Sequence, residues 1–104
     1  MKNINANAIT RLTKSGKVII VFYGTGCINC KIMQPTIEKL ELLFPDVMFY
    51  HVNVDLYPHL IQSYKINSLP TLLPFYHGQS LSAIIGVKSF QVLKKLIHQT
   101  LYIA

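Results

Sequence analysis

Hydrophobic residues in this chain gather in short blocks whose internal spacing differs from block to block. Val18 to Tyr23 is a continuous run of β-branched and aromatic residues, typical of a strand buried on both faces of a sheet. Val47 to Val54 has the same character and predicts a second strand. Thr71 to Tyr76 and Leu81 to Ile85, separated by His77-Gly78, predict two strands joined by a hairpin turn.

Four other segments place hydrophobic residues three or four apart, which is the spacing of an amphipathic helix. These segments are residues 5–14, Cys27 to Phe44, Asp55 to Tyr64, and Ser89 to about Ile103. Gly16 ends the first predicted helix, Asp55 is expected to cap the third, with Pro58 in its first turn, and Ser89 caps the last. Pro35 should kink the second helix, and Pro74, inside a predicted strand, requires an edge or a bulge.

The order helix–strand–helix–strand–helix–strand–strand–helix predicts an α/β fold, with a central mixed sheet flanked by helices on both faces. The length of 104 residues predicts a single domain over residues 1–104. A hydrophobic share of 51% and a charged share of 13% exclude a disordered chain. The longest apolar run, Val18 to Tyr23, is far too short to span a membrane, and the first residues lack the apolar core of a signal peptide. We therefore expect a soluble, cytoplasmic protein with no membrane association.

The net charge of +6 is unevenly distributed, since no acidic residue follows Asp55. Such a basic half could attract nucleic acid, anionic lipid or an acidic protein. However, Arg11 is the sole arginine, and the lysines are not interleaved with aromatic residues as in single-strand binders. We expect solvated lysines on helix surfaces, no nucleic-acid partner, and a monomer.

The candidate chemistry lies in Cys27-Ile28-Asn29-Cys30, between a predicted strand and a predicted helix. A cysteine at a helix N-terminus faces free backbone N–H groups and the positive end of the helix dipole, which stabilise a thiolate. The two-residue spacing brings Cys30 back beside Cys27 within one turn, so a disulfide can open and close with little movement. We expect Cys27, on the loop side, to attack and Cys30, behind it and less accessible, to resolve.

Two other interpretations of this pair remain open. The cysteines could be ordinary buried thiols. They could also be half of a zinc site, but zinc needs four ligands, and the four histidines are scattered without a second ligand pair. A zinc site would therefore have to form across a dimer, and we expect no metal.

From about Val18 to Leu101 the sequence resembles the thioredoxin family, on four landmarks in order. They are the strand followed by Cys27-Ile28-Asn29-Cys30-Lys31, the helix proline Pro35, the loop Ser68-Leu69-Pro70-Thr71, and the glycines Gly78 and Gly86. The resemblance implies the thioredoxin-like fold. Because little chain precedes the first helix, we expect four strands, with five as the alternative.

The resemblance also implies a function and a set of site residues. Cys27 would attack a protein disulfide, Cys30 would resolve the mixed disulfide, and no cofactor would be bound beyond the reversible Cys27–Cys30 disulfide. An NADPH-dependent, flavin-containing thioredoxin reductase would restore the dithiol. Pro70 would be cis and, with Leu69 and the position of Gly26, would shape the substrate groove.

The chain departs from the family pattern around this site. Gly26 and Tyr23 stand where the family has tryptophans, and the motif interior is Ile-Asn in place of Gly-Pro. Without the tryptophan beside Cys27, either the substrate preference has changed or the affinity is weaker. Val21 and His51 stand where the family has a buried Asp and Lys. We hypothesise that His51, or a water, assists Cys30 with its proton; the alternative is a structural histidine on a sheet face.

The prediction is therefore a thiol–disulfide oxidoreductase that reduces protein disulfides. One alternative is a disulfide oxidase or isomerase, which uses the same chemistry in the other direction. The other alternative is a thioredoxin-fold binding or redox-sensing module with weak turnover, which Val21 and Gly26 keep open.

Overall fold

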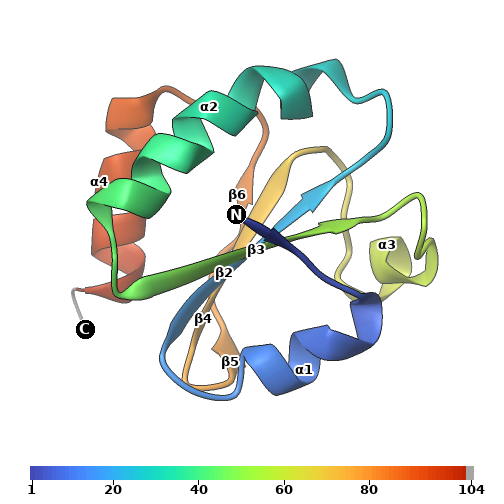
Figure 1. Cartoon of the computed structure of the whole chain (residues 1–104), viewed down its shortest axis with the longest axis horizontal. Helices are drawn as coiled ribbons and strands as arrows, with labels where there is room; N and C mark the ends of the chain where they lie inside the picture. Colours follow the sequence, from blue (N-terminus) through green and yellow to red (C-terminus); the bar gives the residue numbers. More distant parts are fainter. Residues whose placement is uncertain (103–104) are drawn as a thin grey trace.

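A mixed β-sheet runs through the centre of the protein, whose computed structural model describes residues 1–102 (Figure 1). Its strands are β1 (Lys2–Asn3), β2 (Lys17–Tyr23), β3 (Val47–Asn53), β4 (Thr71–Tyr76), β5 (Gln79–Ser80) and β6 (Ile84–Ile85). They lie in the order β1-β3-β2-β4-β5, and β6 also pairs with β4. β1 and β2 run parallel to β3, whereas β4 runs antiparallel to β2.

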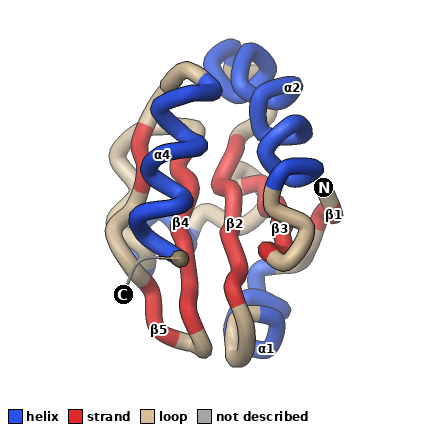
Figure 2. The backbone as a smooth tube through the Cα atoms, turned by 90° about the vertical axis from the view of Figure 1, so that its left-hand side faces the viewer, coloured by secondary structure: helices blue, strands red, loops and turns tan. Residues whose placement is uncertain are grey.

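The helices lie on both faces of this sheet. They are the 3-10 turn η1 (Ala6–Ala8), α1 (Ile9–Leu12), α2 (Ile28–Leu43), α3 (His59–Ser63) and α4 (Phe90–Leu101). α2 and α4 pack side by side on one face, and α1 and α3 lie on the other (Figures 1 and 2). This arrangement confirms the predicted α/β fold with a mixed sheet covered on both faces.

Among residues 1–102, no helix combines the length and the hydrophobicity needed to cross a membrane.

The continuous apolar run of β2 is explained by its central place in the sheet. Successive side chains of a strand point to opposite faces. Ile19 and Val21 therefore enter the core under α2 and α4, while Ile20 and Phe22 enter the core on the α1 and α3 side. The predicted apolar stripe of α2 is buried as well, and Leu40 is fully enclosed. The core on this face fixes α2, and with it the CxxC motif, over the end of β2.

The sheet has more strands than the four or five predicted, for two reasons. The predicted strand from Leu81 to Ile85 is replaced by two short pieces, β5 and β6, each beside a different part of β4. In addition, the N-terminal residues do pair: β1 lies against β3, and the Ile4 N–H donates to the His51 carbonyl at 2.9 Å. Such edge pairing uses backbone groups, so it leaves no hydrophobic pattern in the sequence.

Pro74 lies in the gap between these two short strands. β5 pairs with Phe75 and Tyr76, whereas β6 pairs with Thr71 and Leu72. The Pro74 carbonyl accepts a hydrogen bond from the Leu81 N–H at 2.8 Å, on the side of β4 that faces the gap. A residue that lacks an N–H donor is tolerated there because no partner strand needs one.

The predicted helix caps had mixed outcomes. Ser89 caps α4 as predicted, accepting a hydrogen bond from the Val92 N–H at 3.2 Å. The predicted cap at Asp55 is wrong: α3 begins at His59, its N-cap is Pro58, and no side chain caps it. Asp55 instead bonds to a distant loop, as described below. α4 ends at Leu101, and the predicted end at Ile103 lies outside the described residues.

Candidate active site

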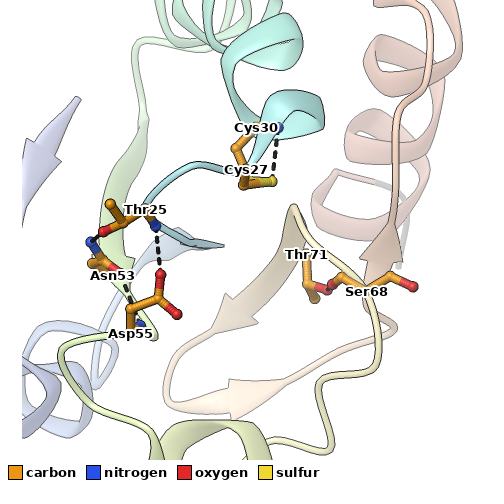
Figure 3. Close-up of a disulfide and its surroundings, with 7 residues drawn as sticks. All are labelled: Thr25, Cys27, Cys30, Asn53, Asp55, Ser68 and Thr71. Atoms are coloured by element: carbon orange, nitrogen blue, oxygen red, sulfur yellow. Dashed lines mark hydrogen bonds between the residues drawn. A yellow bond between two sulfur atoms is a disulfide. The ribbon is translucent and has the colours of Figure 1, made fainter.

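Cys27 and Cys30 form a disulfide where β2 gives way to α2 (Figure 3). Their Cα atoms are 5.3 Å apart, a separation within the usual range for a disulfide. Gly24-Thr25-Gly26 separates the strand from the helix, and Gly26 adopts a φ of +74°, a conformation that glycine accepts without steric cost. The chain can therefore turn sharply and begin α2 directly after Cys27.

Cys27 is the N-cap of α2, and its sulfur takes the part that an oxygen plays in most caps. The Cys30 backbone N–H donates to Cys27 Sγ at 3.1 Å. The same sulfur lies at the positive end of the dipole of a 16-residue helix. Both interactions become stronger when the sulfur carries a negative charge, so this position favours a thiolate at Cys27 once the disulfide is reduced.

Exposure does not separate the two cysteines, although the sequence argument expects Cys30 to be less accessible. Both sulfur-bearing residues are partly buried. Their positions on the helix do differ, because Cys27 is the cap and Cys30 lies in the first turn. The assignment of their roles therefore rests on electrostatics at the helix terminus.

Three residues that the sequence did not assign to the site tie the loop before Cys27 to the end of β3 (Figure 3). Asp55 Oδ2 accepts a hydrogen bond from the Thr25 N–H at 2.7 Å, and the Asn53 side-chain amide donates to Thr25 Oγ1 at 2.9 Å. Asn53 Oδ1 in turn accepts from the Asp55 N–H at 2.9 Å. The end of β3 is thereby tied to the loop that presents Cys27. No local signal in the sequence points to this contact, because about thirty residues separate the partners.

The loop with Pro70 lies opposite the disulfide. The Leu69–Pro70 peptide bond is cis, as the family resemblance implies. Thr71 Oγ1 donates to the Ser68 carbonyl at 2.6 Å, which closes the loop (Figure 3). Pro70 lines the same pocket as both cysteines, whereas Leu69 packs against Gly24, where an added Cβ would meet Leu69 Cδ1 at 3.0 Å.

A pocket of about 360 Å³ adjoins the disulfide. Of the residues singled out in the sequence, it brings together the two cysteines with Val21, Tyr23, Gly26, His51 and Pro70. Val21 and His51 are paired in the register of β2 and β3, so their side chains point to the same face of the sheet. The His51 ring stacks at a tilt against Tyr23, with 4.9 Å between centroids.

Burial is the main cause of a lowered pKa at His51. The positive α-ammonium of Met1 lowers this pKa further, whereas the Glu41 carboxylate raises it. Met1 N and Glu41 Oε1 form an ion pair with each other at 3.1 Å. The neutral imidazole that these effects favour can accept a proton.

Within residues 1–102, no group of three or more His, Cys, Asp or Glu side chains is arranged to hold a metal ion.

Comparison with known proteins agrees with this geometry. The thioredoxin family model matches residues 3–99. A thioredoxin of Chlamydia caviae is 31% identical over 99 residues, covering 95% of this chain and 97% of that protein. Among solved structures, oxidised mitochondrial thioredoxin 3 of Saccharomyces cerevisiae superimposes with a TM-score of 0.86 at 33% identity, covering 95% of this chain and 94% of the yeast chain.

A Malassezia sympodialis thioredoxin structure gives a TM-score of 0.83 at 28% identity, covering 94% of this chain and 90% of that one. The likeness thus extends over nearly the whole length of each chain. Together with a CxxC disulfide at the start of α2 and a cis-proline beside it, these matches show that the chain belongs to the thioredoxin family.

Proposed function

We propose that this protein reduces disulfide bonds in other proteins by thiol–disulfide exchange. The observation that carries the proposal is the place of Cys27 as the N-cap of α2, where its sulfur accepts the Cys30 N–H. A thiolate is the nucleophile in disulfide exchange, and this position favours one. The general activity, thiol–disulfide oxidoreduction, is supported by the thioredoxin relatives and by the CxxC pair.

The proposed reaction has two displacement steps. The Cys27 thiolate attacks one sulfur of the substrate disulfide, a mixed disulfide forms, and the other substrate sulfur leaves as a thiolate that takes up a proton. Cys30 then loses its proton and attacks Cys27 Sγ, which forms the Cys27–Cys30 bond and releases the second substrate thiol. Two electrons pass to the substrate, and the cysteine pair becomes oxidised without any bound cofactor.

Exposed apolar residues beside the disulfide favour proteins as substrates. Ile28 is 72% exposed and Ile32 is 57% exposed, and they lie four residues apart on α2. Residues at this spacing are neighbours on a helix surface. Apolar surface next to a reactive group suits contact with another protein better than with a small hydrophilic thiol.

We further propose that the oxidised pair is returned to the dithiol by an NADPH-dependent thioredoxin reductase. Net reduction requires a source of electrons, and it requires a reducing compartment such as the cytoplasm. The reduction potential of the pair tests this direction. A value near about −270 mV supports a reductase, whereas a value of about −180 to −120 mV indicates a protein that donates disulfides and contradicts the proposed direction.

A turnover assay tests the function itself. The wild type should accelerate the reduction of insulin by dithiothreitol, and Cys27→Ser should be no faster than dithiothreitol alone. When reduced Cys30→Ser is mixed with insulin in the absence of dithiothreitol, it should form a mixed disulfide that it cannot release by itself. Turnover that survives in Cys27→Ser would contradict the role of Cys27, and a wild type no faster than dithiothreitol alone would favour a binding module.

His51 is proposed as the group that accepts the Cys30 proton during the resolving step. It lines the pocket that Cys30 also lines, and its neutral form is favoured by burial. His51→Gln keeps a polar side chain but cannot take up a proton in this range of pH. The resolving rate, measured in a single turnover between pH 5 and 8, should fall by about 100-fold and lose its dependence on a group with a lowered pKa. An unchanged rate and pH profile would assign His51 a structural role.

A further inference from the structure

The pocket beside the disulfide is larger than thiol exchange alone requires. Sulfur exchange needs access to Cys27 Sγ, yet a space of about 360 Å³ lies next to this atom. Pockets that bind small molecules or side chains begin at about 300 Å³. The space is therefore sufficient for one side chain of a substrate that has already docked at the disulfide.

The mouth of this pocket is open because Gly26 carries no side chain. An added Cβ at Gly26 would meet no atom within 4 Å. Gly26, Thr25 and Gln34 line the pocket and are exposed, which places them at its mouth. Val21 and Ile37 also line it but are buried, at 3% and 2% exposed, which places them at its floor. An entering group would pass beside Cys27.

The chemistry of the walls favours an apolar, preferably aromatic, group. The floor is aliphatic, Pro70 forms part of the wall, and the Tyr23 and His51 rings lie 4.9 Å apart at the side. Aromatic rings attract one another at such separations beyond the gain from burial alone. A charged group would lose its hydration on this floor, because the buried lining residues Val21 and Ile37 carry no charge and the lysine of the lining, Lys31, is exposed.

We propose that this pocket is a specificity site that takes one bulky apolar side chain from the substrate protein, next to the cysteine that Cys27 attacks. The proposal rests on the function proposed above, because the side chain enters as part of a docked disulfide substrate. It makes Gly26, Tyr23 and Val21 determinants of substrate choice.

Two matched peptide disulfides test the proposal. In one, each cysteine is flanked by phenylalanine on both sides; in the other, it is flanked by alanine. We expect kcat/KM for the phenylalanine peptide to exceed that for the alanine peptide by a factor on the order of 10 to 100, the value of burying one aromatic side chain. Glutathione disulfide, which is small and charged, should react more slowly than the phenylalanine peptide.

A variant that closes the mouth assigns the preference to this pocket. Gln34→Trp places a large ring at an exposed helical position that lines the mouth. It should abolish the preference for phenylalanine, so that the two peptides react at similar rates. Lys39→Trp is the matched control, since Lys39 is exposed on the same helix but does not line the pocket, and it should keep the preference.

The outcomes separate this proposal from the proposed function. If the wild type reduces insulin but has the same kcat/KM for both peptides, the specificity site is contradicted and the proposed function is not affected. If Gln34→Trp keeps the preference for the phenylalanine peptide, the specificity site is also contradicted. The same holds if glutathione disulfide reacts faster than the phenylalanine peptide. Failure to reduce insulin or either peptide overturns the proposed function itself.

Discussion

Replacing Cys30 by serine or by proline isolates one contact that stabilises the Cys27 thiolate. Both variants lack the second thiol, so Cys27 titrates alone. Serine keeps the backbone N–H that donates to Cys27 Sγ at 3.1 Å, whereas proline has no N–H to donate. Residue 30 lies in the first turn of α2, where the N–H has no partner within the helix, so proline removes no backbone helix bond there.

The size of the effect follows from the strength of a hydrogen bond to a charged atom. Such bonds contribute about 1.5–3 kcal/mol. Cys27 is partly exposed, and water weakens the contact, so we take the lower end of this range. A difference of about 1.4 kcal/mol changes the ratio of thiolate to thiol tenfold, which moves the titration midpoint by about one pH unit. The helix dipole acts equally on both variants and does not contribute to the difference.

The assay follows the ultraviolet absorbance of the thiolate in reduced protein as the pH is varied. We expect the midpoint of Cys30→Pro to lie about one pH unit above that of Cys30→Ser. Iodoacetamide should alkylate Cys30→Ser faster than Cys30→Pro at pH 6, because more of its Cys27 is thiolate. The difference in rate should be only about threefold, since a more stable thiolate is a weaker nucleophile. Circular dichroism and urea unfolding establish that both variants are folded.

Equal midpoints in two folded variants would refute the reasoning, because they would show that the Cys30 N–H does not act on the thiolate. If Cys30→Pro does not fold, Cys30→Ser still decides the broader claim. Its midpoint must lie below the value of about 8.5 that is typical of free cysteine. A midpoint at or above that value would mean that the helix terminus does not activate Cys27.

Two further predictions concern stability. Leu40 is fully enclosed between α2 and the sheet, so Leu40→Ala should lower the free energy of unfolding in urea by about 2–5 kcal/mol. Leu42→Ala, at an 83% exposed position on the same helix, should change it by no more than about 0.5 kcal/mol, and equal losses would contradict the burial argument. The pKa of His51 in the folded state lies below its ordinary value of 6.5, which the unfolded chain keeps. At a pH between the two pKa values, the unfolded chain therefore binds more protons than the folded one. The free energy of unfolding should fall as the pH is lowered through 6.5. Urea unfolding between pH 5 and 8 should show that His51→Gln lacks this part of the fall, and an identical pH dependence in the two proteins would argue that burial does not shift His51.

Several predictions from the sequence succeed because their cause is local. Three features each depend on residues a few positions apart: β2, which is apolar on both faces, the buried apolar stripe of α2, and the Ser89 cap of α4. The His77-Gly78 turn is equally local, since both residues adopt positive φ, at 48° and 89°. The same is true of the CxxC pair, because the N-terminus of the helix supplies the field and the donor that act on Cys27.

What only the tertiary structure decides are contacts between segments distant in the chain. Asp55 carries a strong capping signal, yet its carboxylate is held by the Thr25 N–H and caps no helix. β1 pairs through backbone groups that every residue possesses, so no side-chain pattern distinguishes it. The pocket arises because β2, α2, β3 and the Pro70 loop meet beside Gly26, which has no side chain to fill the space between them. The sequence by itself thus determines the central strands β2, β3 and β4, the long helices α2 and α4, and the reactive pair. The packing of those elements determines what lies next to the sulfur atoms, because burial and open space depend on the neighbours from every element at once.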